Sequence, residues 1–242
     1  MPLALPAIAS SALTVETAIM PTIDSSRRVV IWDIYVRLFH WLLVALLAFS
    51  WWSGERHEME WHRMSGYGIL FLLIFRLYWG FFGTGTARFA HFVRGPRAIY
   101  AYLKTLKKRP HRAAVGHNPV GGWSVVLLLT SMMAMVIAGL FAVDVDGLES
   151  GPLADYVSFD QGRMASDLHA MLFNLLLLLV ALHIAAILYH LLRLRHDLVG
   201  PMLHGLRTLP VEEQVDLPSK APWRALVGLL IAAACTWAIG FR

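Results

Sequence analysis

Apolar residues in this chain are grouped in long runs, and they do not alternate with polar residues in short segments. Five runs stand out, at residues 38–52, 64–82, 122–142, 168–192 and 225–241. Their length predicts α-helices that cross a bilayer, which takes about 20 apolar residues per span. The fifth run holds only about 17 apolar positions, the lower edge of the usual length. We expect no strands, because an open sheet cannot satisfy its backbone hydrogen bonds in lipid.

Composition agrees with this all-α membrane class. The chain is 57% hydrophobic and only 15% charged, a balance that a soluble core does not require. The formal net charge of +5 raises the question of nucleic acid. The basic residues, however, lie in the loops that flank the apolar runs, so we expect lipid contact and no nucleic-acid binding.

Charge asymmetry between the loops predicts the orientation. The segment 83–121 has no Asp or Glu and contains Arg88, Arg94, Arg97, Lys104, Lys107, Lys108, Arg109 and Arg112. The segment 142–168 is acidic, with Arg163 as its one basic residue against Asp144, Asp146, Glu149, Asp155, Asp160 and Asp167. Positive-inside bias then places 83–121 and the N-terminus in the cytoplasm.

The chain therefore divides into four predicted parts. Residues 1–26 form a flexible tail that lacks the basic start of a signal peptide, and residues 27–204 form the membrane domain. Residues 205–224 are a cytoplasmic linker to a C-terminal apolar helix at 225–242, which spans the membrane or lies against it. Within the basic loop, residues 96–109 mix Tyr, Leu and Ile with Lys and Arg, which indicates a short helix on the inner leaflet or, equally, a solvated loop.

Histidines at the ends of the apolar runs carry the candidate chemistry. His169 and His183 are 14 residues apart in one run, so a helix places them on nearly the same face and about 21 Å apart. Topology pairs His62 with His169 at the outer side and His40 with His183 at the inner side. Two ligands per site suit bis-histidine haem, whereas zinc, the competing metal, usually takes four protein ligands in a buried structural site. Cys235 is the single cysteine, so covalent c-type attachment is excluded and the haem would be of the non-covalent b type.

Polar residues near the histidines have possible supporting roles. Arg76 follows His62 by 14 residues, which puts a costly intramembrane charge at the depth of the inner site, where a haem propionate is the expected partner. Arg37 has the same possible role or reaches to lipid phosphate. Gly66 and Gly68 leave space for a flat macrocycle or for close helix packing. His190 lies at the inner boundary, where it contacts a quinone headgroup, stabilises a propionate, or is a plain interface residue.

Several motifs resemble one known family. They are RLFHW at 37–41, EWHRMSGYGIL at 60–70, LIFRLYWG at 73–80, FVRGPRAIYAYL at 92–103, GHNPVGGWSV at 116–125 and DLHAMLFNLLLLLVALHIAAILYH at 167–190. This ordered set resembles the bacterial cytochrome b561 family, four-helix di-haem membrane cytochromes. The resemblance covers about 29–204 and implies that His40, His62, His169 and His183 are the haem ligands. The segments outside it, the tail and the C-terminal helix, are departures from the family's four-span core.

The resemblance implies electron transfer with membrane quinone in the cytoplasmic (inner) membrane of a bacterial cell. The leading interpretation is a di-haem b-type cytochrome that relays electrons between a ubiquinone-type quinone and a periplasmic redox protein. The acidic segment 142–168 favours a basic c-type cytochrome as that partner. Alternatives are a superoxide:ubiquinone oxidoreductase, which the acidic segment disfavours because its substrate is an anion, and the cytochrome subunit of a hydrogenase-like complex.

Overall fold

The structure is a computed structural model that describes residues 26–106, 116–146, 149–210 and 221–240. Three predicted segments lie partly outside the described residues: nearly all of the tail, the part of the basic loop with Lys107, Lys108, Arg109 and Arg112, and half of the linker. Five long helices account for the five apolar runs: α1 (Ile34–Glu55), α2 (Met59–Phe82), α5 (Pro119–Phe141), α6 (Phe159–Leu192) and α8 (Pro222–Gly240). Each is long and apolar enough to cross a membrane, so the all-α membrane class is confirmed.

Side-chain caps fix where these helices begin. Asp33 caps α1 by accepting from the backbone N–H of Val36 at 2.8 Å, and Asn118 caps α5 by accepting from Gly121 at 2.8 Å. Ser158 and Gln161 form a capping box at the start of α6. Both α2 and α6 begin several residues before the apolar run that predicted them. The apolar pattern marks only the part that lipid must surround, whereas the hydrogen-bonded helix continues into polar surroundings.

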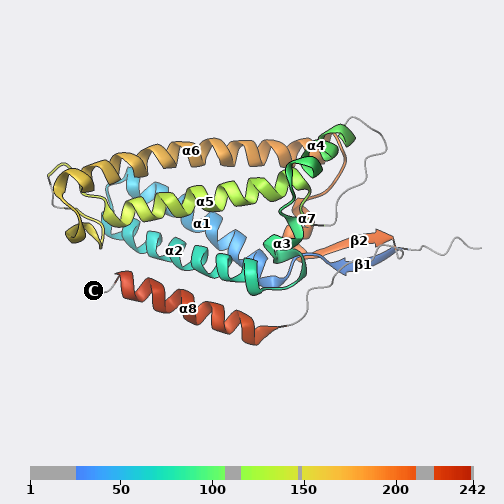
Figure 1. Cartoon of the computed structure of the whole chain (residues 1–242), viewed down its shortest axis with the longest axis horizontal. Coiled ribbons are helices and arrows are strands. Elements are labelled where there is room, and N and C mark those ends of the chain that lie inside the picture. Colours follow the sequence, from blue (N-terminus) through green and yellow to red (C-terminus); the bar gives the residue numbers. More distant parts are fainter. Residues whose placement is uncertain (1–25, 107–115, 147–148, 211–220, 241–242) are drawn as a thin grey trace, which may run out of the picture.

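The helices form two antiparallel pairs that meet at a shared core (Figure 1). The helix α1 packs along α2, α5 packs along α6, and contacts between α2 and α5 join the pairs. Buried side chains from all four helices fill the centre: Phe39, Leu43, Ile69, Leu73, Leu129, Met132, Met135 and Leu176. Only Gly162 and Leu176 are buried in the 34 residues of α6, so most of this helix is exposed to lipid or faces the space between the pairs.

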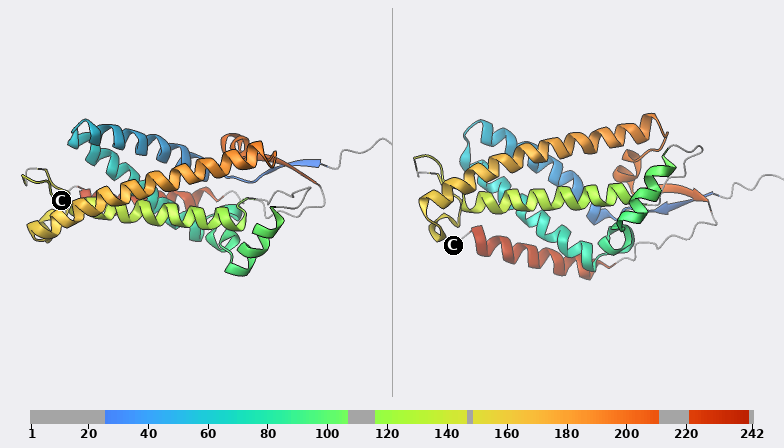
Figure 2. Two further views of the ribbon diagram at one scale, coloured as in Figure 1. Left: turned by 90° about the horizontal axis from the view of Figure 1, so that it is seen from above. Right: turned by 45° about the horizontal axis from the view of Figure 1, so that its top comes forward.

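The C-terminal helix α8 adds a fifth helix on the outside of α2. Figure 2 shows it on the opposite side of the bundle from α6. The close approach of α8 to α2 depends on small residues of α8. A Cβ on Gly228 would lie 2.4 Å from the ring of Tyr78, and Ala232 is fully buried. Its other face exposes Trp223, Leu230 and Trp237. A Cβ on Gly240, the last residue of α8, would lie 3.1 Å from the ring of Tyr67, so α8 packs along α2 from Tyr78 to Tyr67.

The expectation that the chain has no strands is wrong. Strands β1 (Ser26–Val30) and β2 (Leu206–Pro210) pair antiparallel, with Arg28 opposite Thr208. Gly205 ends the short helix α7 (Val199–His204) with a positive φ of 83°, and its carbonyl accepts from the backbone N–H of Ile31 at 2.9 Å. The prohibition on open sheets applies only in lipid, and this pair lies beyond the end of α1, outside the apolar helices (Figure 1).

The two ends of the bundle differ in charge. The basic end carries the two strands, α7, η1 (Gly85–Ala87), α3 (Phe89–Phe92) and α4 (Pro96–Thr105). The helix α4 confirms the short helix expected in 96–109; it packs on α5 and buries none of its residues. The acidic end carries the turn between α1 and α2 and residues 142–146 and 149–158, with η2 (Ala154–Tyr156).

Candidate functional site

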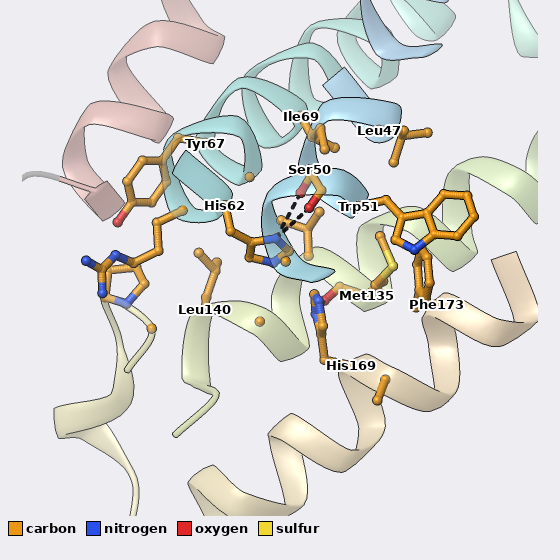
Figure 3. A pocket seen from close by; sticks show the side chains of 18 of the residues that line it. Leu47, Ser50, Trp51, His62, Tyr67, Ile69, Met135, Leu140, His169 and Phe173 are labelled. Carbon is orange, nitrogen blue, oxygen red and sulfur yellow. Dashed lines mark hydrogen bonds between the residues drawn. The ribbon is translucent and has the colours of Figure 1, made fainter. Parts of the chain in front are cut away.

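At the acidic end, His62 of α2 and His169 of α6 face one another (Figure 3). Their ring centroids are 6.0 Å apart and the ring planes are inclined by 78°. The two residues are 107 positions apart in the chain, so only the packing of the helices brings them together. The pairing of His62 with His169 predicted from topology is the arrangement seen.

Each of these imidazoles has its orientation set by a helix carbonyl. His62 Nδ1 lies 2.9 Å from the carbonyl oxygen of Ser50, and His169 Nδ1 lies 2.8 Å from that of Met135. A carbonyl oxygen only accepts, so Nδ1 carries the proton in both rings and Nε2 keeps its lone pair. This is the state in which an imidazole binds a metal through Nε2.

A cavity of about 280 Å³ adjoins both rings and is lined by all four helices of the two pairs. Gly66 is part of its wall, and a Cβ there would meet no atom within 4 Å, so this glycine borders open space. Gly68, by contrast, would place a Cβ 3.1 Å from Leu46 and serves helix packing. The wall is largely apolar, with Leu47, Trp51, Ile69, Leu140 and Phe173, as a haem macrocycle requires.

The separation of the rings leaves room for one iron, which His62 and His169 would hold together. A metal–nitrogen bond is about 2 Å long, and the centre of an imidazole ring lies about 1 Å behind its nitrogen, which gives a centroid separation of about 6 Å. In the part of the chain that the structure describes, no group of three or more His, Cys, Asp or Glu residues could hold a metal ion. The donor set at this end is thus a pair of imidazoles.

At the basic end, His40 of α1 and His183 of α6 lie close enough to interact electrostatically. Here the surroundings are different, because His40 Nδ1 is buried and has no hydrogen-bond partner. No helix carbonyl holds it as Ser50 and Met135 hold the rings at the acidic end.

Arg76 of α2 is a buried charge at the basic end. Its side chain is 3% exposed, its guanidinium lies 5.0 Å from the ring of Phe89, and its Nη1 has no hydrogen-bond partner. Asp33 interacts with it electrostatically, but that carboxylate already accepts from Val36, Trp79 and Thr84. Arg76 forms no ion pair with any described residue. A buried guanidinium in this state fits an anionic ligand.

Arg37 has a structural role that sequence reasoning did not anticipate. Its Nη1 donates to the carbonyl of Leu203 at 2.7 Å, and Trp41 donates to the carbonyl of Met202 at 3.2 Å. These bonds attach α7 to the start of α1. The Nε atom of Arg37 is buried without a partner, so one donor of this side chain is still available.

His190 of α6 lies beside α4 and the start of α5. Its Nδ1–H donates to the carbonyl of Ala186 at 2.9 Å, so Nε2 accepts, and the hydroxyl of Tyr102 lies 3.2 Å from it. The amide nitrogen of Asn118 is 3.5 Å from the same atom. Burial raises the pKa of Tyr102, with Tyr189 adding to the effect and Asn118 opposing it, so the phenol stays a donor. A half-buried imidazole with phenol and amide neighbours can exchange protons and hydrogen-bond a polar headgroup.

His117, to which the sequence assigned no role, is a half-buried residue at the basic end just before α5, and its Nδ1 atom is buried. Its ring centroid lies 4.6 Å from both Trp32 and Phe92, and its Nδ1 has no hydrogen-bond partner. Burial lowers the pKa of His117 to about 3, and the charge of Arg76 adds to this, so the ring is neutral at physiological pH. The one sequence signal was its place directly before the Asn-Pro start of α5.

The acidic segment is partly engaged with the bundle. Glu149 pairs with Arg63 of α2 at 2.7 Å, and one carboxylate oxygen of Asp144 is buried. Asp146, Asp155, Asp160 and Asp167 are exposed, so this end still presents negative charge beside the His62 and His169 pair.

Comparison with known proteins places the chain in a family. The sequence profile of prokaryotic cytochrome b561 matches residues 31–205, which cover α1 to α7. No curated protein and no solved structure matches the chain. The match spans well over half of the 242 residues and leaves out α8, the helix already noted as a departure from the four-span core. The chain therefore belongs to the prokaryotic cytochrome b561 family and is a multi-pass bacterial membrane protein, a b-type cytochrome of electron transfer.

Proposed function

We propose that the protein binds two non-covalent haem b groups, one between His62 and His169 and one between His40 and His183. The observation that carries the proposal is the 6.0 Å separation of the His62 and His169 rings beside a four-helix cavity. The second pair also takes one ligand from α6. His183 follows His169 by 14 residues, so the helix places it on nearly the same face and about 21 Å further along the axis. When bound, haem iron supplies the one-electron redox change.

The chain's own residues hold the groups and shape their surroundings. Arg76 supports a propionate of the basic-end haem, because a guanidinium that is 3% exposed and has an unpartnered nitrogen needs a buried anion. The free Nε of Arg37 is a second candidate donor. At the acidic end, the carbonyls of Ser50 and Met135 keep both ligand rings in the metal-binding tautomer.

The activity that follows is electron relay between a ubiquinone-type quinone and a periplasmic redox protein. We place quinone exchange at the basic end, where the Tyr102 hydroxyl and the Asn118 amide can donate to a carbonyl oxygen of the quinone. His190 Nε2 lies between these two groups and can take up a proton and pass it on. Full reduction of quinone to quinol consumes two electrons and two protons, and this end is the cytoplasmic one by the positive-inside rule, with the N-terminus on the same side.

The partner at the acidic end is a positively charged soluble protein, and a c-type cytochrome fits best. Exposed carboxylates at Asp146, Asp155 and Asp160 lie in the segment that leads directly into the helix of His169. Opposite charge on the partner raises the rate of encounter. Superoxide, an anion, would be repelled by the same groups, so the relay is favoured over the superoxide oxidoreductase.

A pyridine haemochrome assay on the purified protein tests the proposal. We expect close to two haems per chain, because His62 with His169 and His40 with His183 form two ligand pairs. All of the haem should extract into acid acetone, because the one cysteine has no attachment motif. One haem per chain, or haem that stays with the polypeptide, would contradict the two-site proposal.

A further inference from the structure

Two glycines lie against the imidazoles at the acidic end, each on a helix next to the one that carries the histidine. A Cβ on Gly139 of α5 would lie 2.9 Å from Nδ1 and 3.0 Å from Cε1 of His169. A Cβ on Gly54 of α1 would lie 3.2 Å from Nδ1 and 3.4 Å from Cε1 of His62. Both approaches are tighter than ordinary carbon contacts, so each ring occupies space that any other residue would fill.

The position of each glycine relative to the accepting carbonyl is the same. His62 donates to the carbonyl of Ser50, four residues before Gly54, and His169 donates to that of Met135, four residues before Gly139. In an α-helix the Cα–Cβ bond tilts toward the N-terminus of the helix. The side chain at position i+4 therefore points back over the carbonyl oxygen of residue i. A glycine at i+4 therefore uncovers that carbonyl, whose second lone pair is still free to accept.

We propose that Gly54 and Gly139 are positioning residues for the acidic-end haem. Each uncovers a helix carbonyl so that the ligand imidazole donates its Nδ1–H there and turns Nε2 toward the iron. This inference rests on the proposed ligation by His62 and His169. A hydrogen bond from Nδ1 to a carbonyl makes the imidazole a stronger electron donor and favours the oxidised iron. The two glycines thereby set both the ring orientation and the redox potential of that haem.

The experiment compares Gly139→Ala, Gly54→Ala and Gly121→Ala in the purified, haem-loaded protein. Gly121 is a matched control on α5, since a Cβ there meets Asn118 at an ordinary 3.4 Å. Redox titration gives the potential of each haem. Low-temperature electron paramagnetic resonance of the oxidised haems reports the relative orientation of the two ligand rings.

For Gly139→Ala we expect a changed resonance and a higher potential at one haem only, or loss of that haem with the other retained. Gly54→Ala should give the same change in smaller degree, because the new Cβ is less crowded. It would lie 3.2 Å from Nδ1 of His62, whereas the Cβ of Gly139→Ala would lie 2.9 Å from Nδ1 of His169. Gly121→Ala should change neither haem. Retention of the second haem in Gly139→Ala shows that the bundle is folded. If that variant does not fold, the milder Gly54→Ala tests whether the glycines are positioning residues.

Two different failures are distinguishable. If His169→Ala removes a haem while Gly139→Ala and Gly54→Ala leave resonance and potential unchanged, the glycines are not positioning residues and the ligation stands. If His169→Ala retains both haems, the proposed ligation fails, and this inference fails with it.

Discussion

The two histidine pairs share α6 but differ in what surrounds them. At the acidic end both rings donate to helix carbonyls, at 2.9 and 2.8 Å, and a glycine makes room for each ring. At the basic end His40 Nδ1, Arg76 Nη1 and His117 Nδ1 are buried and have no hydrogen-bond partner. The protein alone preorganises the acidic-end ligands, whereas the basic end presents a buried guanidinium that an anionic group must satisfy.

This difference predicts different redox properties for the two sites. Carbonyl hydrogen bonds to the ligands favour oxidised iron at the acidic end. The buried positive charge of Arg76 stabilises the reduced state of the haem at the basic end. We expect the basic-end haem to have the higher potential, and the following predictions sharpen or break the comparison.

The largest expected effect is complete loss of one haem on removing a ligand. His62→Ala or His169→Ala should remove the acidic-end haem and spare the other, while His40→Ala or His183→Ala should do the reverse, because each iron loses one of two protein bonds. Optical redox titration measures which component disappears. His57→Asn is the control, since His57 lies in the exposed turn after α1 with a φ of 58° that Asn tolerates. Loss of the same component in His62→Ala and His183→Ala would overturn the pairing.

Arg76 should matter next, and only at the basic end. Arg76→Leu leaves a buried carboxylate without its cation, a loss of about 3 kcal/mol, or roughly a hundredfold weaker retention of that haem. Any haem that stays bound should have a lower potential. Arg76→Lys keeps the charge and should restore most of the binding. Haem content and potential at the basic end measure both changes, and an equal effect at both haems would show that Arg76 acts through the fold.

His190 should affect quinone reactivity and not haem binding. His190→Phe removes the acceptor of the Tyr102 hydroxyl and should slow oxidation of the haems by a ubiquinone analogue about tenfold, the worth of one hydrogen bond. Tyr102→Phe should give a smaller decrease, since it leaves the imidazole in place. Stopped-flow oxidation by quinone gives the rates. An unchanged rate in the fully loaded His190→Phe protein would place the quinone elsewhere.

The smallest effect concerns docking at the acidic end. Asp146→Asn combined with Asp155→Asn should lower the second-order rate with a basic c-type cytochrome a few-fold and flatten its dependence on salt. These two residues are chosen because Glu149 pairs with Arg63 and Asp144 is partly buried. Stopped-flow rates at low and high salt measure the change. A rate that salt and these substitutions leave unchanged would indicate an apolar docking surface.

The boundaries of the sequence-based prediction follow from its physical basis. Apolar runs located all five helices because lipid demands them, but they missed the polar first turns of α2 and α6. They also missed the strands β1 and β2, whose pairing joins segments almost 180 residues apart outside the apolar helices. Arg37 was read as a propionate or lipid ligand, and its bond to Leu203 could not be foreseen because α7 comes to it only in the folded chain.

The sequence by itself determined the membrane class, the family and the spacing of His169 and His183, since hydropathy and helical periodicity are local properties of the chain. Tertiary structure alone decided that the ring of His62 faces that of His169 at 6.0 Å and that Nδ1 of His117 is buried. It also decided which carbonyls and glycines surround the ligands. These features depend on how the side chains of one helix meet the backbone of another, and contacts of that kind leave no period or motif in a single sequence.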